Sequence, residues 1–522
     1  MIKKSSIIKR IIERAAETPS DAAVILGDHT LKYVVLMERA GRAASAIARS
    51  VSGVSPRVCY FGKTSFEYYE LFMASLMRGG VFIPINWRFA PAEAVGVISD
   101  ADADIIVVEP EFFAIANALI ASGMQASKIL ITGDGASAEL ESYEAWIDAG
   151  DSLSSVEETS EDAICLQLYT SGTTGEPKGV QLSHRAFVSQ FDLFDKLPES
   201  GRFAKGDVLF ICLPGFHVVG AAYILQGLFR GATAVIQRDF NPLEAGVLIE
   251  RCNVTHTILV PTIIGMIIDA AKKSQLNLSS LRCVFYGAAP ISRNLMQEAL
   301  ALLSCDMFQA YGLTETAGLV TLLPPEDHTA DSGARLESAG FAAPGVEIRI
   351  VDGAGAVCPT GDIGEVIIRT PTLMSGYWKK PEVTEDAVKD GWFYTGDAGL
   401  VDEDGYLFLK DRQKDMIISG GENIYPAEIE RVLATCPGVA DATVIGIPDE
   451  KWGESVLAVI VSTNGADISE QSVQEYLRER LAGFKVPKRV EFRSSLPRNH
   501  LGKILKKEVR APYWRDKVRQ IS

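Results

Sequence analysis

Residues 169–179 read Tyr-Thr-Ser-Gly-Thr-Thr-Gly-Glu-Pro-Lys-Gly, and they follow a short apolar run, Ala-Ile-Cys-Leu-Gln-Leu, at residues 163–168. The apolar run has the length and composition of a buried strand. The glycines allow sharp turns that point backbone N–H groups inward, while the hydroxyl and lysine side chains add donors and charge. The P-loop pattern needs Gly-Lys-Ser/Thr, so Pro-Lys-Gly predicts a different kind of phosphate-binding loop. The alternative is a plain surface turn, but an ordinary turn needs only one or two such residues.

Composition and charge narrow the function classes. The 522 residues are 47% hydrophobic and 23% charged, which is typical of a globular protein with roughly three or four folding units. A net charge of −16 argues against general nucleic-acid binding. Residues 485–519 hold 12 basic and three acidic residues. A basic tail on an acidic body suits an anionic small ligand, although a solvated basic helix end is the alternative.

The eight cysteines are scattered and never form a Cys-x-x-Cys pair, so we expect buried thiols in a reducing, cytoplasmic compartment. The first 14 residues have the pattern of an amphipathic helix and lack the apolar core of a signal peptide. Residues 208–229 carry no charged side chain, but glycines, a proline and a histidine interrupt them. We expect a buried strand, loop and helix around a pocket there, and no transmembrane segment.

Hydrophobic periodicity predicts the fold. Amphipathic stretches such as residues 294–303 alternate with short apolar runs, which indicates α/β layers with mostly parallel strands. After residue 345 a period-two pattern predicts a small antiparallel barrel, and a charged break at 411–415 marks a boundary before α+β texture. We therefore predict an α/β protein with domains at 1–411 and 412–522. The apolar runs lie at 79–86, 104–108, 128–132, 164–169, 207–212, 233–237, 256–260, 282–286 and 306–310.

Four further segments accompany the phosphate loop in order: residues 309–316 (Gln-Ala-Tyr-Gly-Leu-Thr-Glu-Thr), 394–397 (Tyr-Thr-Gly-Asp), 412–430 and 497–503 (Pro-Arg-Asn-His-Leu-Gly-Lys). Together they resemble the adenylate-forming superfamily of acyl-CoA synthetases, peptide-synthetase adenylation domains and luciferases. The resemblance runs over essentially the whole chain. It implies a large N-terminal domain of two α/β subdomains plus a small β-barrel, followed by a mobile α+β C-terminal domain.

The resemblance also implies a chemistry. A carboxylate attacks the α-phosphorus of ATP and expels pyrophosphate, which requires charge neutralisation more than covalent help. The cofactors implied are ATP, Mg²⁺ and coenzyme A. In the resemblance, the β,γ-phosphates would be held by Thr170, Ser171, Gly172, Thr173, Thr174 and Lys178. Adenine would pack on Gly287, Ala288, Ala289 and Pro290, with Tyr311 and Gly312 beside them, and the ribose would be bound by Asp397 and Arg412. Thr314 would touch the α-phosphate, Glu315 would bind Mg²⁺, and Lys503 would bridge the carboxylate and the α-phosphate. Singly, each of these residues has an ordinary structural explanation, and the ordered set is what favours the site.

The C-terminal part carries a second set of expectations. Lys414 stands where the family keeps a hinge residue, so the resemblance implies that the C-terminal domain rotates between half-reactions. Gly420, Gly421 and Glu422 would then help to form a thiol tunnel. Lys485 and Lys488 are candidate contacts for the CoA phosphates.

The acyl side is identified by Phe216-His217, where the histidine would lie at the pocket mouth; a satisfied core histidine is the alternative. Residues 218–225 contain no acid, so a buried ammonium would be unpaired and an amino-acid substrate is not expected. Gly215 replaces a bulkier family residue, so we expect a wider pocket. The expected apolar lining is Cys212, Phe216, Val218, Ala221, Ile224, Val260 and Thr262.

The sequence therefore predicts an ATP-dependent ligase that joins a fatty or other apolar carboxylic acid to CoA. Only 19 residues follow Lys503, too few for a fused carrier domain, so free CoA is the expected acceptor. An aryl acid–CoA ligase and an acyl-AMP ligase that loads a separate carrier protein stay open as alternatives. So do a non-catalytic scaffold and, more remotely, a luciferase-like oxygenase. We keep a homodimer as an expectation for the assembly.

Overall fold

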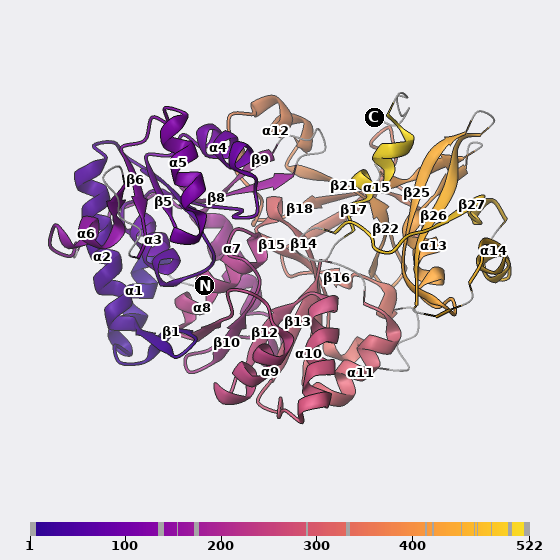
Figure 1. Cartoon of the computed structure of the whole chain (residues 1–522), viewed down its shortest axis with the longest axis horizontal. Helices are drawn as coiled ribbons and strands as arrows, with labels where there is room; N and C mark the ends of the chain where they lie inside the picture. The colour runs from indigo at the N-terminus through magenta and orange to yellow at the C-terminus, as the bar shows by residue number, and fades with distance from the viewer. Residues whose placement is uncertain are drawn as a thin grey trace. The chain divides into compact units, whose positions relative to one another are not determined.

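The computed structural model describes residues 7–133, 140–153, 155–171, 177–288, 291–329, 335–412, 415–419, 422–449, 452–463, 465–466, 468–481, 483–498 and 504–515. Helices and sheets alternate along the chain (Figure 1), so the predicted α/β class is confirmed. The backbone contacts divide the chain into two compact units. Unit 1 contains residues 1–336, 340–347 and 369–391, and unit 2 contains residues 337–339, 348–368 and 392–522. The boundary at 411/412 stays a prediction.

A nine-stranded sheet in unit 1 contains most of the predicted apolar runs. Its central strands are parallel, and its edge strands pair antiparallel. Parallel strands buried on both faces read as continuous apolar runs, which explains why the sequence located them. In sheet order the strands are β16 (Phe341–Ala342), β15 (Gly318–Leu323), β14 (Asp306–Leu313), β13 (Cys283–Gly287), β12 (His256–Leu259), β10 (Val208–Ile211), β11 (Thr233–Ile236), β1 (Ala22–Leu26) and β2 (His29–Lys32).

A second, eight-stranded sheet in unit 1 carries the phosphate-loop hairpin near one edge. Its first three strands pair antiparallel, and the others are parallel. In order they are β19 (Gly376–Tyr377), β9 (Pro177–Ser183), β8 (Ile164–Ser171), β4 (Val81–Ile85), β3 (Arg57–Phe61), β5 (Ile105–Val108), β6 (Lys128–Ile131) and β7 (Glu141–Ser142).

Helices cover these sheets and close two apolar cores. One core lies between β10–β14 and helices α9 (Pro242–Arg251), α10 (Pro261–Ser274) and α11 (Arg293–Leu303), which run beside those strands in Figure 1. The other lies between β3–β6 and helices α4 (Pro91–Asp100) and α5 (Phe113–Ala121). The remaining helices of unit 1 are α1 (Ile7–Glu17), α2 (Tyr33–Ser50), α3 (Phe66–Met77), α6 (Tyr143–Asp148), α7 (His184–Phe194), α8 (Val218–Arg230) and α12 (Pro381–Ala387).

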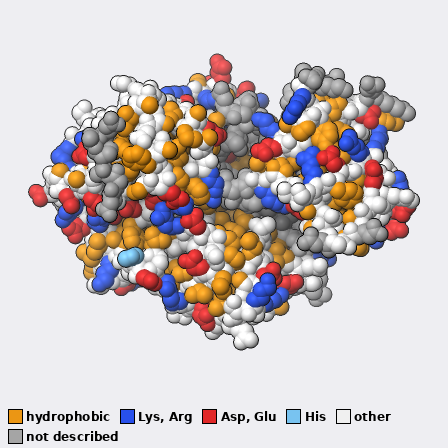
Figure 2. Space-filling model, viewed as in Figure 1, with side chains coloured by type: hydrophobic (Ala, Val, Ile, Leu, Met, Phe, Trp, Pro, Cys, Tyr) orange, Lys and Arg blue, Asp and Glu red, His pale blue; other side chains and the backbone are white. Residues whose placement is uncertain are grey.

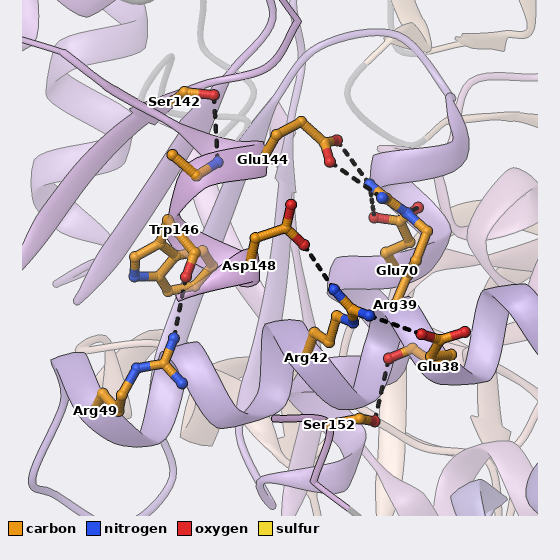
Figure 3. Close-up of polar contacts among 11 residues, drawn as sticks. Glu38, Arg39, Arg42, Arg49, Glu70, Ser142, Glu144, Trp146, Asp148 and Ser152 are labelled. Carbon is orange, nitrogen blue, oxygen red and sulfur yellow. Dashed lines mark hydrogen bonds and ion pairs between the residues drawn. The ribbon is translucent and has the colours of Figure 1, made fainter. Parts of the chain in front are cut away.

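Figure 3 shows an ionic cluster that ties three of these helices together. Arg39 of α2 donates two hydrogen bonds to Glu70 of α3, 2.5 and 3.1 Å long, and two to Glu144 of α6. Glu70 is 1% exposed, and the hydroxyl of Tyr143 also donates to it over 2.9 Å. Burial raises the pKa of Glu70, and the hydrogen bonds from Arg39 offset only part of that rise. Removing Arg39 would leave the buried Glu70 carboxylate without a cation, whereas removing Glu70 would leave Arg39 paired with Glu144 alone.

Unit 2 contains two further sheets. The period-two runs form an antiparallel sheet in which β18 pairs with β21 and β21 with β22. A second sheet, in the order β24-β23-β26-β25 with β27 on β26, is covered by α13 and α14 on one face. The bounds are β17 (Glu347–Val351), β18 (Gly364–Arg369), β21 (Trp392–Val401), β22 (Leu407–Arg412), β23 (Ile417–Ser419), β24 (Glu422–Ile424), α13 (Pro426–Leu433), β25 (Val439–Asp449), β26 (Gly453–Ser462), α14 (Glu470–Arg478), β27 (Arg489–Phe492) and α15 (Lys506–Arg510).

The charged surface, the cysteines and the uncharged stretch were each the subject of a sequence-based expectation. Acidic and basic side chains are interspersed over the face shown in Figure 2. All eight cysteines lie in described residues as free thiols, and five of them are buried. The uncharged stretch 208–229 forms β10, a loop and α8, as predicted. Within the described residues no helix is long and apolar enough to cross a membrane.

Candidate functional site

The phosphate-loop hairpin is formed by β8 and β9. The two strands pair antiparallel, with Thr170 opposite Lys178 and Tyr169 opposite Gly179. The hairpin is fixed to its neighbours below the tip, because the Tyr169 hydroxyl donates to Asp100 over 2.6 Å. The structure thus places Thr170 and Lys178 side by side at the base of the loop. Of the other predicted loop residues, Ser171 is described only in its backbone, and Gly172, Thr173 and Thr174 lie outside the described residues.

A glycine is required just after the loop. A Cβ on Gly179 would lie 2.6 Å from Nε2 of Gln167, which is fully buried and accepts a hydrogen bond from Arg57 over 2.8 Å. Such a distance is shorter than real side-chain contacts, so Gly179 allows β8 and β9 to stay in register. The sequence marked Gly179 as part of the motif, and packing explains why.

The predicted adenine and α-phosphate residues lie at the carboxyl ends of two adjacent parallel strands, β13 and β14. Gly287 pairs with Ala310, and a Cβ on Gly287 would lie 2.2 Å from the Ala310 carbonyl oxygen. Ala288 has a φ of 64°, an uncommon conformation for a residue with a side chain. Tyr311 and Gly312 follow in β14, and a Cβ on Gly312 would lie 1.5 Å from the carbonyl oxygen of Gly318. Ala289 and Pro290 lie outside the described residues.

Thr314 and Glu315 stand in the 3₁₀ helix η3 (Thr314–Thr316), which follows β14 directly. The fully buried Thr316 fixes this turn: its hydroxyl accepts from Leu313 N over 3.1 Å and lies within hydrogen-bonding distance of two carbonyl oxygens. Because Thr316 is held inside, the preceding Thr314 and Glu315 are half-buried at the strand ends. Carboxyl ends of parallel strands are where α/β folds place their ligands.

Glu315 is held by a segment 60 residues later in the chain. Its carbonyl oxygen accepts a hydrogen bond from Met374 N over 2.7 Å, and its Oε1 accepts one from the Tyr377 hydroxyl over 2.9 Å. Lys178 Nζ lies 5.2 Å from the centre of the Tyr377 ring. The structure therefore brings Lys178 and Glu315, two predicted site residues, to one tyrosine.

Sequence reasoning missed Tyr377. Burial, and next the Glu315 carboxylate, raise the pKa of its hydroxyl, so that hydroxyl is protonated and acts as the donor to Glu315. The signal available in the sequence was the Gly-Tyr-Trp triplet at 376–378, where a glycine precedes two large aromatic residues.

The acyl-side motif lies at the start of α8. His217 is the residue before the helix, and its ring centre lies 4.4 Å from that of Phe216, which is 5% exposed. The expectation of a wider pocket at Gly215 was wrong. A Cβ there would lie 2.6 Å from the Tyr68 ring, and the Tyr68 hydroxyl donates to the Gly215 carbonyl over 2.8 Å. Of the seven predicted lining residues, Thr262 is exposed. The other six are buried, namely Cys212, Phe216, Val218, Ala221, Ile224 and Val260.

In unit 2, the two predicted ribose residues are cross-strand neighbours. Asp397 on β21 is opposite Arg412 on β22. Asp397 is 9% exposed and its N–H donates to the Thr395 hydroxyl over 3.0 Å, while Gly396 between them has a φ of 70°. The glycine permits this turn within the strand. Only the backbone of Arg412 is described.

The remaining C-terminal candidates are only partly described. Lys503, Lys414, Gly420 and Gly421 lie outside the described residues, and Glu422 is described only in its backbone, opposite Ser419. Lys485 donates to both oxygens of Glu428, 2.7 and 2.8 Å away. Lys488 lies 3.5 Å from Asp449 Oδ2 and 4.9 Å from the Trp452 ring centre. Of the two candidate contacts for CoA phosphates, Lys485 already has a close carboxylate partner.

Comparisons with known proteins cover nearly the whole chain. Residues 11–378 match the family model described as AMP-binding enzyme, and residues 428–503 match the model described as AMP-binding enzyme C-terminal domain. A fatty acid–[acyl-carrier-protein] ligase, ScoC from Streptomyces coeruleorubidus, is 39% identical over 513 residues, which is 97% of this chain and 96% of that protein. A feruloyl-CoA synthase from an Amycolatopsis species is 36% identical over 502 residues, 96% of this chain and 97% of that protein.

A solved structure supports the same relationship. The crystal structure of ATP-bound MatB from Rhodopseudomonas palustris superposes with a TM-score of 0.88 at 31% identity, and the match covers 97% of this chain and 98% of that one.

Proposed function

The chain belongs to the AMP-binding enzymes of the adenylate-forming superfamily and is an ATP-dependent, AMP-forming acid–thiol ligase, and we propose that its substrates are an apolar carboxylic acid and the thiol of coenzyme A. The observation that carries this proposal is that Lys178 and Glu315 both contact Tyr377, beside the ends of β13 and β14. That arrangement offers a cation and a carboxylate at the place where the fold family binds a nucleotide.

The proposed reaction has two half-reactions. In the first, a carboxylate oxygen forms a bond to the α-phosphorus of ATP, and the bond from that phosphorus to the bridging oxygen breaks as pyrophosphate leaves. In the second, the CoA sulfur forms a bond to the acyl carbon, AMP leaves with its oxygen, and the thiol proton passes to solvent. The first step needs positioning and neutralisation of negative charge.

In this proposal each candidate residue has a role in one of those tasks. Lys178 neutralises the outer phosphates, and Thr314 donates to the α-phosphate. Asp397 and Arg412 bind the ribose, and Lys503 bridges the two reacting oxygens. His217 lies at the mouth of the acyl pocket, where it orients the carboxylate.

Magnesium fits the donors that are present. Mg²⁺ is usually held by one or two carboxylates together with substrate phosphates and water, so one carboxylate, Glu315, suffices on the protein side. Glu315 is half-buried and its Oε1 is fixed by Tyr377, which leaves Oε2 as the oxygen for the ion. The ion would withdraw charge from the phosphate oxygens during adenylation.

The acid is proposed to be apolar and to lack an ammonium group. The first two turns of α8 contain no acidic residue, and Ala221 and Ile224 are 0% and 1% exposed. A buried ammonium there would lose its hydration without gaining a carboxylate. Aliphatic and aryl acids both meet this requirement, and the names of the two relatives include one of each kind.

A carrier protein is the second candidate acceptor. It is favoured by one specific observation, the 39% identity to a ligase whose name gives an acyl-carrier protein as its acceptor. Either acceptor supplies a phosphopantetheine thiol, so the second half-reaction has the same bond changes.

The experiment is to measure release of pyrophosphate and AMP from MgATP across a panel of fatty, aryl and ring-bearing acids, each with CoA, with a phosphopantetheine-bearing carrier protein, or with no acceptor. CoA-dependent multiple turnover with one class of acid would support the main proposal. A burst of one equivalent that only the carrier protein converts into turnover would support the second. Failure to release pyrophosphate with any acid would contradict both.

Three expectations remain part of the proposal. Lys414 would be the hinge about which residues 412–522 rotate between the two half-reactions, so Lys414→Pro should slow thioester formation more than adenylation. Equal rates for wild type and variant in the second step would contradict the hinge. Homodimer formation and a cytoplasmic location stay predictions, which light scattering and cell fractionation would test.

A further inference from the structure

A short strap, residues 374–378, connects the phosphate hairpin to η3 in unit 1. Its strand β19 pairs with β9, with Tyr377 opposite Val180. Trp378 N donates to the Gly179 carbonyl over 2.8 Å, and at the other end Met374 N donates to the Glu315 carbonyl over 2.7 Å. The strap therefore fixes the distance between the residue after Lys178 and the backbone of Glu315.

Tyr377 is the strap residue whose side chain reaches the site. It is 9% exposed, its hydroxyl is 2.9 Å from Glu315 Oε1, and its ring centre is 5.2 Å from Lys178 Nζ. The backbone N–H of Tyr377 donates to the Thr384 hydroxyl of α12 over 2.9 Å, so the tyrosine is held from behind. One side chain thus contacts the two charged groups that the nucleotide would need.

The two contacts have different consequences. A hydroxyl that donates to Oε1 fixes the rotation of the carboxylate, as hydrogen bonds to metal-binding carboxylates commonly do. An aromatic face attracts a cation without neutralising it, so Lys178 is oriented yet keeps its charge for a phosphate. A carboxylate partner for Lys178 would compete with the phosphates, whereas a ring does not.

We propose that Tyr377 is a positioning residue for adenylation, with its hydroxyl orienting Glu315 toward the metal ion of the nucleotide and its ring orienting Lys178 toward the phosphates. The proposal rests on the proposed function, because it assumes that this site binds a metal–ATP complex. It goes further by assigning separate tasks to two parts of one side chain, which separate substitutions can test.

The test uses the full chain with Tyr377→Phe, which removes the hydroxyl and keeps the ring, and Tyr377→Leu, which removes both. Tyr143→Phe is the matched control: the Tyr143 hydroxyl is also buried and also donates over 2.9 Å to a glutamate, Glu70, in the helix cluster of Figure 3. All four proteins are compared by thermal unfolding, by calorimetric binding of ATP in EDTA, and by Mn²⁺ binding to the ATP-loaded protein, followed by electron paramagnetic resonance.

Tyr377→Phe is expected to weaken Mn²⁺ binding by about tenfold, the effect of losing one hydrogen bond to a charged group, while ATP binding in EDTA stays within about twofold. Tyr377→Leu should weaken both, because Lys178 also loses its ring. Tyr143→Phe should change neither, although it should unfold at a lower temperature. Acyl-AMP supplied with CoA should be converted normally by every variant.

Wild-type Mn²⁺ affinity in Tyr377→Phe would overturn the assignment of the hydroxyl, and so would an equal loss of ATP binding with and without metal. Unchanged ATP binding by Tyr377→Leu would overturn the assignment of the ring. If the wild-type protein itself bound no Mn²⁺–ATP, the proposed function would fail and this proposal would fail with it, which is a result that the variants alone cannot produce.

Discussion

Tyr377 and Glu315 are 62 residues apart in the sequence and are joined by a 2.9 Å hydrogen bond from the tyrosine hydroxyl to Oε1 of the glutamate. The pairing of β19 with β9 makes this contact possible, because it lays the tyrosine beside the strand that carries Lys178. The residues that the sequence assigned to the phosphates and to the metal are therefore parts of one connected arrangement.

Replacing Lys178 should impair nucleotide binding without unfolding the protein. Lys178→Ala would remove the charge that we propose faces the ATP phosphates, and we expect the KM for ATP to rise by about tenfold or more. Lys379→Ala is the control, since Lys379, the residue just after the strap 374–378, is exposed and pairs with Asp102 over 2.7 Å. Initial rates of pyrophosphate release at varied ATP check the prediction, and equal KM values for the two variants would contradict it.

Lys503 should matter for only one half-reaction. Lys503→Ala is expected to slow acyl-AMP formation by about 10²-fold or more, because in the proposed mechanism it would remove the charge that bridges the two reacting oxygens. Conversion of supplied acyl-AMP and CoA into acyl-CoA should stay near the wild-type rate. The two half-reactions are followed separately by chromatography. A similar loss in both would show that Lys503 supports the fold rather than the chemistry.

Gly312→Ala should damage the strand pair that ends at η3. A Cβ at position 312 would lie 1.5 Å from the Gly318 carbonyl oxygen, so β14 and β15 would have to separate. We expect a loss of about 2 kcal/mol in the free energy of unfolding together with weaker ATP binding. Gly353→Ala is the control, since no atom lies within 4 Å of its added Cβ. Urea unfolding followed by circular dichroism gives the stability of the two variants. Equal free energies of unfolding for Gly312→Ala and Gly353→Ala would contradict the prediction.

The ion pairs in Figure 3 should differ in their effect on stability. Glu70 is buried against Arg39, so Glu70→Ala leaves a partly buried guanidinium poorly paired and should cost about 3 kcal/mol. Arg42→Ala breaks only the exposed pairs to Glu38 and Asp148 and should cost less than about 1 kcal/mol. Chemical unfolding of the two variants gives the comparison. A larger loss for Arg42→Ala would show that burial does not set the strength of these pairs.

The free energy of unfolding should fall in mild acid because His184 is buried in its neutral form. This histidine begins α7 and is 3% exposed, and burial lowers its pKa to about 4. An unfolded histidine titrates near pH 6.5, so between about pH 6.5 and 4 the unfolded chain binds the extra proton. The contribution of neutral His184 to the free energy of unfolding is complete above about pH 6.5. It is lost as the pH falls toward 4, by up to about 3 kcal/mol.

His184→Gln should therefore show a smaller loss of unfolding free energy between pH 7 and pH 4 than the wild-type protein. His29→Gln, at an exposed position, should keep the wild-type pH profile. Parallel profiles for His184→Gln and wild type would remove His184 as a cause of acid sensitivity.

Much of the fold could be predicted from the sequence because its signals are local. Apolar runs such as 283–287 mark buried parallel strands, and the alternation in 365–369 marks a strand with two different faces. The strand that leads into the phosphate loop was also predicted, because a short apolar run marks a buried strand, whereas its pairing with β9 was not. The order of the motifs along the chain was enough to identify Thr314, Glu315 and Asp397 as site candidates.

Other features could not be predicted, because they depend on which distant segments pack together. The sequence suggested free space at Gly215, but the Tyr68 ring, 147 residues away in the chain, occupies it. Lys485 was a candidate for binding phosphate, yet Glu428 from α13 lies 2.7 Å from its ammonium group. Neither neighbour is visible in the local pattern of residues.

The sequence by itself determined the residue types of the site and the elements that carry them, since strand and turn preferences act over a few residues. The tertiary structure alone decided that Tyr377 lies between Lys178 and Glu315. The physical reason is register: a shift of one residue between β19 and β9 would turn the tyrosine to the opposite face of the sheet. That register is set by hydrogen bonds and packing between segments nearly 200 residues apart, which no local pattern encodes.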